Sequence, residues 1–400
     1  MLPAAPIYMD NHATTRVDPR VVEAMLPYFS EAYGNAGSVG HAFGDAARHA
    51  VDHSRALIAE AINAAPEEIV FTSGATESNN LAIRGVAERP RRRGDHFISV
   101  RTEHKAVLDP LARLGRRGYE ITLLEVEQHG SPRAGWLDPQ RVADAIRDDT
   151  ALVSVMLANN EIGVIQSLKE IAALCRERGV TIHCDATQAV GKIPVDVQHL
   201  GVDLMSFSAH KIYGPKGVGA LYVRQSRPAV RLDPQITGGG QQQGVRSGTL
   251  NVPGIVGFAR ALELCMEVLP NEMQRLTQLR QRLWTELNKE LDGVKLCGPA
   301  LDDAPEPYNR LRLPGNLDVA FGNVDGEALL LAMDELAVSS GAACSSTDPG
   351  PSHVLLALGM TEDLARSTLR FGLGRFNTSS EVDFAAATVT AAVSGLRKLA

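Results

Sequence analysis

The sequence predicts an α/β protein whose large domain is built on a mainly parallel sheet covered by helices. Between about residues 69 and 223, short apolar runs rich in β-branched residues alternate with longer helical patterns, which is typical of βα units. The expected strands are EIVFTSG, HFISV, ITLL, ALVSVML, VTIHCD and LMSFS. Residues 78–88, 138–147 and 168–178 show helical patterns, and we expect them to cover the sheet.

A second, smaller α+β domain is expected after this region. A long amphipathic segment, residues 253–291, contains Pro270 and is expected to be interrupted there. A Pro/Asp-rich stretch, the strands LDVAF and LAVSS, and a closing helix follow it. The chain lacks internal repeats and low-complexity segments, so the two parts are expected to pack as one body.

Composition excludes several classes of partner. The chain has 400 residues and a net charge of −7, which gives no global basic field for nucleic acid or an anionic membrane. The basic run at 89–93 is interpreted as a solvated loop. Five cysteines without CxxC spacing argue against a disulfide framework and a structural zinc site, so we expect no metal. The N-terminus lacks a secretion signal and no apolar run could span a bilayer, so a cytoplasmic location is expected.

The strongest local signal for chemistry is SFSAHKIYGPKG. Lys211 follows Ser208 and His210 at the end of an apolar strand and precedes a loop rich in Gly and Pro. Ligands bind beyond the carboxyl ends of the strands in such sheets, so this lysine is expected to face a crevice. A covalently acting lysine needs such a rigid, partly desolvated place, and the flanking polar groups suit a phosphate. The alternative is a solvated surface lysine.

Other polar residues follow the expected strands. In FTSGATESNN, Ala75 and Thr76 open a helix after Gly74, which is an anion-binding geometry, with ordinary N-capping as the alternative. Asp185 ends the strand VTIHCD, with Gln188 three residues on. This carboxylate suits a pyridinium nitrogen, although a helix cap or salt bridge would also explain it.

Three further side chains are expected at the same edge of the sheet. Asn160 follows ALVSVML, where an asparagine is also a common turn former. His104 follows HFISV and suits stacking on a flat ring or proton transfer, with a structural histidine as the alternative. Arg370 in STLRFGLGRF suits bidentate binding of a carboxylate, with a surface arginine as the alternative.

Cys344 is the candidate reactive thiol. It lies after the strand LAVSS in a run of small and polar residues that predicts a mobile, exposed loop. Cys175, Cys184 and Cys265 lie in apolar patterns that predict inert, buried thiols, whereas Cys297 near a turn stays undecided.

Taken in order, these motifs resemble the cysteine desulfurases of the NifS/IscS type, in the class V aminotransferase group of fold-type I pyridoxal-phosphate enzymes. The resemblance runs from YMDNHATTRVDPRVVEAMLPYF through FTSGATESNN, TEHKAVLD, NNEIGVIQ, DATQAVGK, SAHKIYGPKG, GGGQQQGVRSGT and SSGAACSS to LRFGLGRF. It implies a seven-stranded-type sheet in a large domain at 17–262, and a small domain at 1–16 and 263–400 that carries the cysteine.

The resemblance also implies a role for each candidate. Lys211 would bind pyridoxal 5'-phosphate covalently, Asp185 would pair with the ring nitrogen, and Cys344 would carry a persulfide. His104 would stack on the ring, Arg370 would bind the substrate carboxylate, and Gln188 and Asn160 would contact the ring hydroxyl and the substrate. The phosphate would be held by Ala75, Thr76, Ser208 and His210, joined by Thr249 from the other subunit of a homodimer.

The implied reaction takes sulfur from L-cysteine and leaves alanine. The sulfur would pass to an acceptor or iron–sulfur scaffold protein. A selenocysteine lyase or aminotransferase of the same fold, and a non-catalytic scaffold, are the alternatives. One departure concerns Gln241, Gln242, Gln243 and Gly244, where the family usually has Gln-Glu-Arg-Gly. The lost charge pair puts the anchoring of this loop in doubt.

Overall fold

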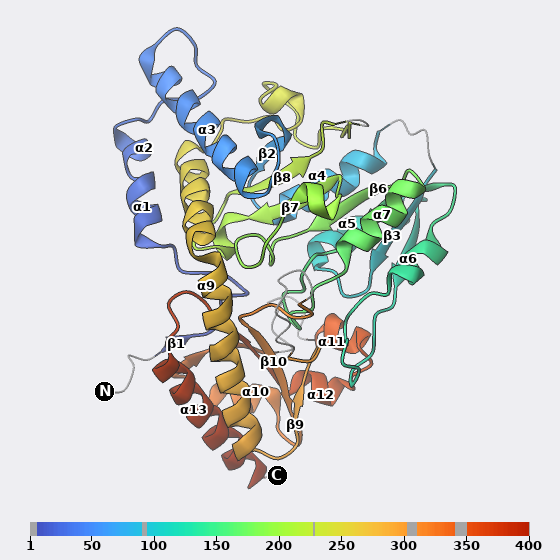
Figure 1. Ribbon diagram of the computed structural model, residues 1–400, viewed down its shortest axis with the longest axis vertical. Coiled ribbons are helices and arrows are strands. Elements are labelled where there is room, and N and C mark those ends of the chain that lie inside the picture. Colours follow the sequence, from blue (N-terminus) through green and yellow to red (C-terminus); the bar gives the residue numbers. More distant parts are fainter. Residues whose placement is uncertain (1–5, 90–93, 227–228, 302–309, 341–349, 400) are drawn as a thin grey trace.

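The computed structural model describes residues 6–89, 94–226, 229–301, 310–340 and 350–399. Its larger part is a seven-stranded sheet in the order β2-β8-β7-β6-β5-β3-β4 (Figure 1). The strands are β2 (Ile69–Thr72), β3 (His96–Val100), β4 (Glu120–Leu124), β5 (Thr150–Ser154), β6 (Thr181–Asp185), β7 (Leu204–Ser208) and β8 (Gly219–Val223). β8 runs antiparallel to both of its neighbours, β2 and β7, and the other six strands all run in the same direction. The mainly parallel sheet predicted from the sequence is therefore confirmed.

Helices cover both faces of this sheet because its strands are apolar on both sides. The helices of this part are α1 (Pro19–Met25), α2 (Pro27–Ser30), α3 (Ala42–Ala61), α4 (Ala75–Ala87), α5 (Lys105–Gly115), α6 (Pro139–Ala145), α7 (Leu168–Glu177) and α8 (Val197–Leu200). Along β7, Leu204 packs in a cluster with α4, whereas Met205 and Phe207 pack in the large core with residues of α3, α7 and α9. Alternate side chains of one strand thus serve two helical layers.

The long helix α9 (Val252–Glu290) joins the two parts of the molecule (Figure 1). The side chain of Asn251 caps its first turn by accepting a hydrogen bond from the Gly254 N–H. The expected interruption at Pro270 is wrong, because the helix continues through it. Proline removes the hydrogen bond to the carbonyl four residues earlier, and here that carbonyl belongs to the partly exposed Met266, where water can replace the bond.

The smaller part contains a four-stranded antiparallel sheet in the order β12-β13-β10-β9. Its elements are β9 (Val294–Leu296), β10 (Asn316–Phe321), α10 (Gly326–Leu331), β11 (Leu336–Ala337), β12 (Ser339–Ser340), α11 (His353–Ala357), α12 (Glu362–Arg366), β13 (Thr368–Gly372) and α13 (Ser379–Arg397). The N-terminal β1 (Ile7–Tyr8) pairs with β11. Apolar side chains of β10 and β13 pack against the second half of α9 and against α13.

The loop whose anchoring the sequence put in doubt is held by a neutral side chain. Gln242 accepts a hydrogen bond from the Phe71 N–H at 2.6 Å and donates to the Phe71 carbonyl at 2.8 Å. Phe71 lies in β2, an edge strand of the large sheet, so the amide of Gln242 takes the place of one residue of a neighbouring strand. The amide of Gln242 therefore anchors this loop to β2 within one chain.

Candidate active site

One cavity of about 780 Å³ gathers most of the predicted site residues. It lies where β2, β5, β6 and β7 end, and the chain near the N-terminus and residues of β12 and β13 close its other side. We call it the central cavity. The predicted residues that line it are Ala75, Thr76, His104, Asn160, Asp185, Gln188, Ser208, His210, Lys211 and Arg370. Ten residues from six separate segments of the sequence thus meet in one space.

The two other predicted residues are Thr249 and Cys344. Thr249 is exposed and lies outside the lining of the central cavity. Cys344 lies outside the described residues. The four other cysteines are buried, and burial raises the pKa of each thiol. The prediction of inert thiols at 175, 184 and 265 is confirmed, and Cys297 joins them.

The helix α4 begins without a side-chain cap. Its cap residue is Gly74, which has a φ of +153° and no side chain to accept from the first-turn N–H groups. A Cβ on Gly219 would lie 2.7 Å from the Cα of Gly74, so glycine lets β8 approach this turn closely. Ser208 and His210 line the same end of the cavity. Free N–H groups at a helix start suit a phosphate, which favours the anion-binding interpretation of Ala75 and Thr76 over side-chain capping.

Asp185 is held rigidly at the end of β6. One carboxylate oxygen accepts from the side chain of Asn79 at 2.7 Å, and the other accepts from the Thr187 N–H at 3.0 Å. Asn79 lies in α4, so the helix that opens at the anion site also orients this carboxylate. A fixed carboxylate at the cavity wall can accept a hydrogen bond from the protonated nitrogen of a heteroaromatic ring.

Lys211 reaches into the cavity from the short turn after β7. Its Nζ donates to the carbonyl oxygens of His12 and Ala13, each at 2.6 Å. His210 beside it hydrogen-bonds through Nδ1 with Thr14 Oγ1 at 3.1 Å. Burial, followed by the charge of Lys211, lowers the pKa of His210 to about 4, so this imidazole is neutral at pH 7. The amine therefore lies in a polar but tightly packed surrounding.

His104 has two functions in the structure. Its Nδ1 accepts a hydrogen bond from the Ala106 N–H at 3.0 Å and so caps α5, while the residue also lines the cavity. Burial lowers the pKa of the imidazole, which makes the neutral form the resting one. Since Nδ1 is an acceptor, the single proton lies on Nε2. The two interpretations left open by the sequence, structural and functional, are compatible.

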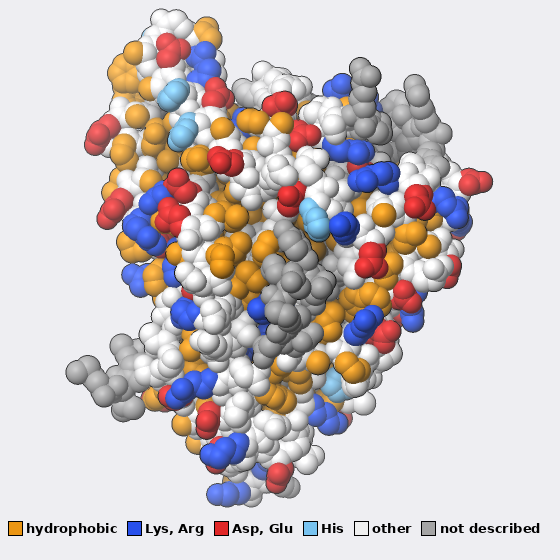
Figure 2. All heavy atoms as spheres, in the orientation of Figure 1, with side chains coloured by type: hydrophobic (Ala, Val, Ile, Leu, Met, Phe, Trp, Pro, Cys, Tyr) orange, Lys and Arg blue, Asp and Glu red, His pale blue; other side chains and the backbone are white. Residues whose placement is uncertain are grey.

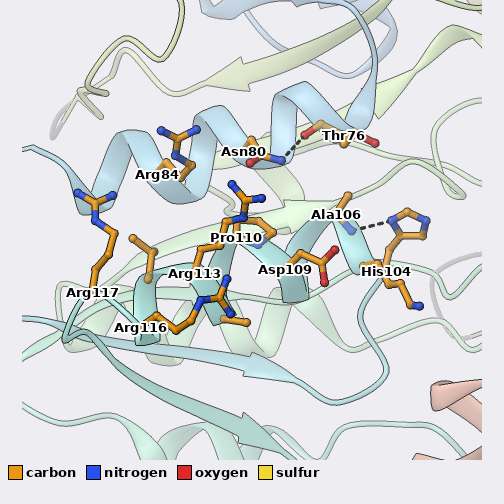
Figure 3. A pocket seen from close by; sticks show the side chains of 13 residues that line it. Thr76, Asn80, Arg84, His104, Ala106, Asp109, Pro110, Arg113, Arg116 and Arg117 are labelled. Atoms are coloured by element: carbon orange, nitrogen blue, oxygen red, sulfur yellow. Dashed lines mark hydrogen bonds between the residues drawn. The ribbon is translucent and has the colours of Figure 1, made fainter. Parts of the chain in front are cut away.

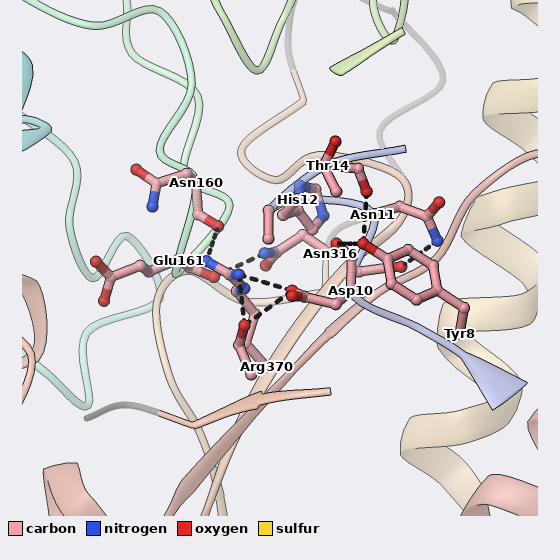
Figure 4. A network of polar contacts seen from close by, with 12 residues as sticks. Tyr8, Asp10, Asn11, His12, Thr14, Asn160, Glu161, Asn316 and Arg370 are labelled. Atoms are coloured by element: carbon pink, nitrogen blue, oxygen red, sulfur yellow. Dashed lines mark hydrogen bonds and ion pairs between the residues drawn. The ribbon is translucent and has the colours of Figure 1, made fainter. Parts of the chain in front are cut away.

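Arg370 is placed by three neighbours (Figure 4). From β13, its Nη2 donates to Asp10 Oδ1 at 2.8 Å and to Ser339 Oγ at 2.9 Å, and its Nη1 donates to the Asn160 carbonyl at 3.1 Å. Its side chain is only 6% exposed, so it is not a surface arginine. Asp10, Ser339 and Glu161 also line the cavity, and sequence reasoning did not single them out as site residues. Asp10 stands in the motif YMDNHATT, which is the signal that could have found it.

A second hollow, of about 980 Å³, lies along α4 and α5 (Figure 3). Four arginines line it, namely Arg84, Arg113, Arg116 and Arg117. It shares Thr76, His104, Lys105 and Ala106 with the central cavity, but neither Lys211 nor Asp185 lines it. Glu88 forms ion pairs with Arg117 at 2.6 Å and with Arg84 at 3.5 Å, and so neutralises part of the positive charge of this hollow. The amine and carboxylate chemistry therefore belongs to the smaller, central cavity.

Comparisons with known proteins agree with this geometry. The family described as aminotransferase class V matches residues 7–384. A cysteine desulfurase IscS from Anaeromyxobacter sp. (strain K) is 55% identical over 380 residues, which are 95% of this chain and 90% of that protein. The chain is a cysteine desulfurase of the class V aminotransferase family. Enzymes of this kind depend on pyridoxal phosphate, and the same holds for this one.

Solved structures support the same assignment. A NifS-like protein superposes with a TM-score of 0.87 at 36% identity, covering 98% of this chain and 100% of that one. SspA in complex with cysteine superposes with a TM-score of 0.77 at 35% identity, covering 93% of this chain and 99% of that one. The fold-type I architecture implied by the sequence is thus confirmed for this cysteine desulfurase.

The residues of the central cavity fit pyridoxal phosphate. Its phosphate needs an anion site, its ring nitrogen a carboxylate and its aldehyde an amine. The uncapped start of α4, Asp185 and Lys211 offer these three groups around one cavity. Of the described residues, no group of three His, Cys, Asp or Glu could hold a metal ion, and no helix is long and apolar enough to cross a bilayer.

Proposed function

We propose that this cysteine desulfurase removes sulfur from free L-cysteine through Lys211 and carries it as a persulfide on Cys344. The balance is L-cysteine plus the Cys344 thiol giving L-alanine plus the Cys344 persulfide. The bond between the substrate's Cβ and sulfur breaks, a sulfur–sulfur bond forms, and a proton goes to carbon. The observation that carries the proposal is the meeting of Lys211, Asp185 and the anion site in one cavity.

Pyridoxal phosphate, when bound, supplies an electron sink for the negative charge that develops at the substrate's Cα. Asp185, whose carboxylate accepts a hydrogen bond from Asn79 at 2.7 Å, would keep the ring nitrogen protonated. Ala75, Thr76, Ser208 and His210, which line the cavity near the start of α4, would hold the phosphate. The Nζ of Lys211 takes the proton from Cα, as a positioned amine in a polar cavity can.

Arg370 and Asn160 bind the substrate. The guanidinium of Arg370 is held by Asp10 and Ser339, so its planar edge is fixed before the carboxylate arrives. The Nε2–H of His104 is the donor that returns a proton during the later steps, because its Nδ1 is occupied by the Ala106 N–H. The Cys344 thiolate attacks the substrate's sulfur.

The sulfur on Cys344 is then offered to an acceptor protein, for which iron–sulfur cluster assembly is the proposed use. The name IscS, borne by relatives 55% and 49% identical to this chain, supports this destination. A cytoplasmic location belongs to the same proposal.

A homodimer is part of the proposal. Five of the large apolar side chains exposed near the N-terminus form what we call the N-terminal patch: Leu26, Phe29, Tyr33, Val39 and Phe43. Figure 2 shows apolar side chains over α1, α2 and the start of α3. A cluster of this kind on a folded protein marks an interaction surface. Thr249, exposed and outside its own cavity, would serve the phosphate of the partner.

Visible absorbance tests the role of Lys211. The purified protein with pyridoxal phosphate is expected to show the long-wavelength band of a cofactor linked to a lysine, and Lys211→Ala is expected to lose this band and the release of alanine. The matched control is Lys169→Ala, an exposed lysine of α7, which should keep both. A band that survives Lys211→Ala would contradict the role of Lys211 as the lysine that binds the cofactor.

A further inference from the structure

Lys192 is a charged group beside the active site to which the proposed chemistry gives no role. It follows the segment DATQAVG, and its Nζ donates to Gln188 Oε1 at 2.6 Å. Burial, followed by the positive charge of Lys211, lowers its pKa to about 7. Because burial disfavours the charged form of a lysine, the position of Lys192 calls for an explanation.

The contacts of Gln188 fix which end of its side-chain amide faces which neighbour. The protonated form of lysine has only donors, so the atom 2.6 Å from its Nζ is then the amide oxygen. The amide nitrogen donates to the His12 carbonyl at 2.9 Å, which can only accept. Both contacts demand the same orientation, so the assignment of oxygen and nitrogen is chemically determined.

The orientation extends to the imidazole of His12. Its Nδ1 lies 3.0 Å from Gln188 Oε1, so Nδ1 must carry the proton. Burial lowers the pKa of His12 well below its usual value, so the ring is neutral. The carbonyl of His12 in turn accepts from Lys211 Nζ at 2.6 Å. Lys192, Gln188, His12 and Lys211 therefore form one connected network.

The amide of Gln188 has one hydrogen left. Among the described residues no acceptor is recorded for the second N–H of Nε2, and Gln188 lines the central cavity. If the amide turned over, a carbonyl oxygen would take the place of this donor. The anionic ring oxygen of pyridoxal phosphate would be stabilised by the donor and repelled by the carbonyl.

We propose that Lys192 is a positioning residue that locks the amide of Gln188 with its N–H toward the cofactor's ring oxygen, and thereby tunes the acidity of the link between cofactor and Lys211. The inference rests on the proposed function, because it needs the cofactor in the central cavity. A hydrogen-bond donor to the ring oxygen makes that oxygen a weaker acceptor for the proton of the link, which lowers the pKa of the link. Loss of this donor is expected to raise the pKa of the link.

A double-mutant cycle on the full-length holoenzyme tests this role. The pH dependence of the long-wavelength absorbance is measured for the parent, Lys192→Met, Gln188→Met and the double variant, with Lys169→Met as the control for loss of an exposed lysine. Each of the two single changes is expected to raise the apparent pKa by about one pH unit, the size of one hydrogen bond to a charged group. The double variant should show no larger shift than Gln188→Met alone, because Lys192 acts through Gln188.

Two results would overturn the inference. An unchanged apparent pKa in Lys192→Met would show that the lysine does not set the donor. A full additional shift from Lys192→Met in the Gln188→Met background would show that its charge acts directly. If the parent itself shows no band, the proposed function fails, and this outcome is distinct because it does not depend on the variants. Circular dichroism of each variant checks that the fold is retained.

Discussion

Individual side chains in this site have both a structural and a chemical role. His104 caps α5 with Nδ1 and leaves its only proton on Nε2 toward the cavity side. Asp185 receives hydrogen bonds from α4 and from its own following turn. These hydrogen bonds orient His104 and Asp185 before substrate binds.

The double role of His104 leads to a prediction that compares two substitutions at this position. His104→Asn keeps an acceptor suited to the cap, so its melting temperature should stay close to that of the parent. His104→Ala loses the cap and should lose about 1 kcal/mol of stability. Both remove the Nε2–H, so both should lower kcat by about 10²-fold or more. Thermal melts and alanine release measure the two effects, and an active His104→Asn would refute the proton-donor role.

At this scale the sequence predicted more than the fold class. Ten of the twelve candidate residues line one cavity. Nine of them lie at or after the ends of strands of the large sheet, whose carboxyl ends meet there, whereas Arg370 comes from β13 of the smaller sheet. Asp10 and Ser339 were not singled out, since their closeness to Arg370 depends on how β12, β13 and the N-terminal segment come together. Glu161, next to Asn160 in the chain, was not singled out either. Such long-range pairing leaves little trace in local pattern.

Among the elements, the edge strand β2 is protected by a side chain in place of another strand. Gln242 makes both backbone contacts to Phe71, at 2.6 and 2.8 Å. The loop that carries it has positive φ values at both Gln242 and Gln243, which are 51° and 58°. The side-chain amide thus holds a backbone conformation that non-glycine residues rarely adopt.

Removing that amide should destabilise the protein. Gln242→Ala leaves the N–H and carbonyl of Phe71 without these partners, so we expect a loss of about 1–3 kcal/mol in the free energy of unfolding. Denaturant titration measures it. Gln241→Ala is the neighbouring control, because Gln241 bonds only within its own loop, to the Gly248 N–H. Equal effects of the two substitutions would contradict the docking role of Gln242.

The central strands contain a polar layer that makes stability depend on pH. His183 in β6 lies between Ser154 of β5 at 2.8 Å and Ser206 of β7 at 3.0 Å. Burial lowers its pKa to about 4 from the ordinary 6.5. Between these values the unfolded chain binds a proton that the folded chain does not, so stability is full above pH 6.5 and is lost as the pH falls toward 4.

His183→Gln should remove this contribution. Glutamine can bond both serines but does not titrate, so the variant should lose less stability than the parent when the pH falls from 6.5 to 4. The difference should reach at most about 1.4 kcal/mol per pH unit. Denaturant unfolding at several pH values measures it. Parallel pH profiles of the two proteins would show that His183 does not titrate as described.

For the whole molecule, the sequence predicted both parts but not how they are joined. Periodicity predicted six strands of the large sheet but not β8, and it expected a break at Pro270 where α9 runs on without one. A proline whose lost hydrogen bond faces water is tolerated, and exposure cannot be known before the packing is. The same helix crosses the boundary predicted at residues 262 and 263, so its packing in both parts unites them.

The N-terminal patch predicts a dimer in solution. Light scattering should give about twice the chain mass of 42.9 kDa. Replacing Phe29 and Tyr33, which are 62% and 63% exposed, by Asp should shift the protein toward monomer without unfolding it. A parent that is monomeric at micromolar concentration would contradict the proposed dimer, as would a double variant with an unchanged mass.

The central claim is that an amine at position 211 and a thiol at position 344 act on the same molecule of L-cysteine. The most direct measurement is to incubate the holoenzyme with L-cysteine, quantify alanine, and locate added sulfur by mass spectrometry of the cysteine-containing peptides. The account predicts one extra sulfur on Cys344, in amounts matching the first alanine released, and none on Cys344→Ser. Extra sulfur on Cys175, Cys184, Cys265 or Cys297 in place of Cys344, or alanine release unaffected by Cys344→Ser, would contradict it.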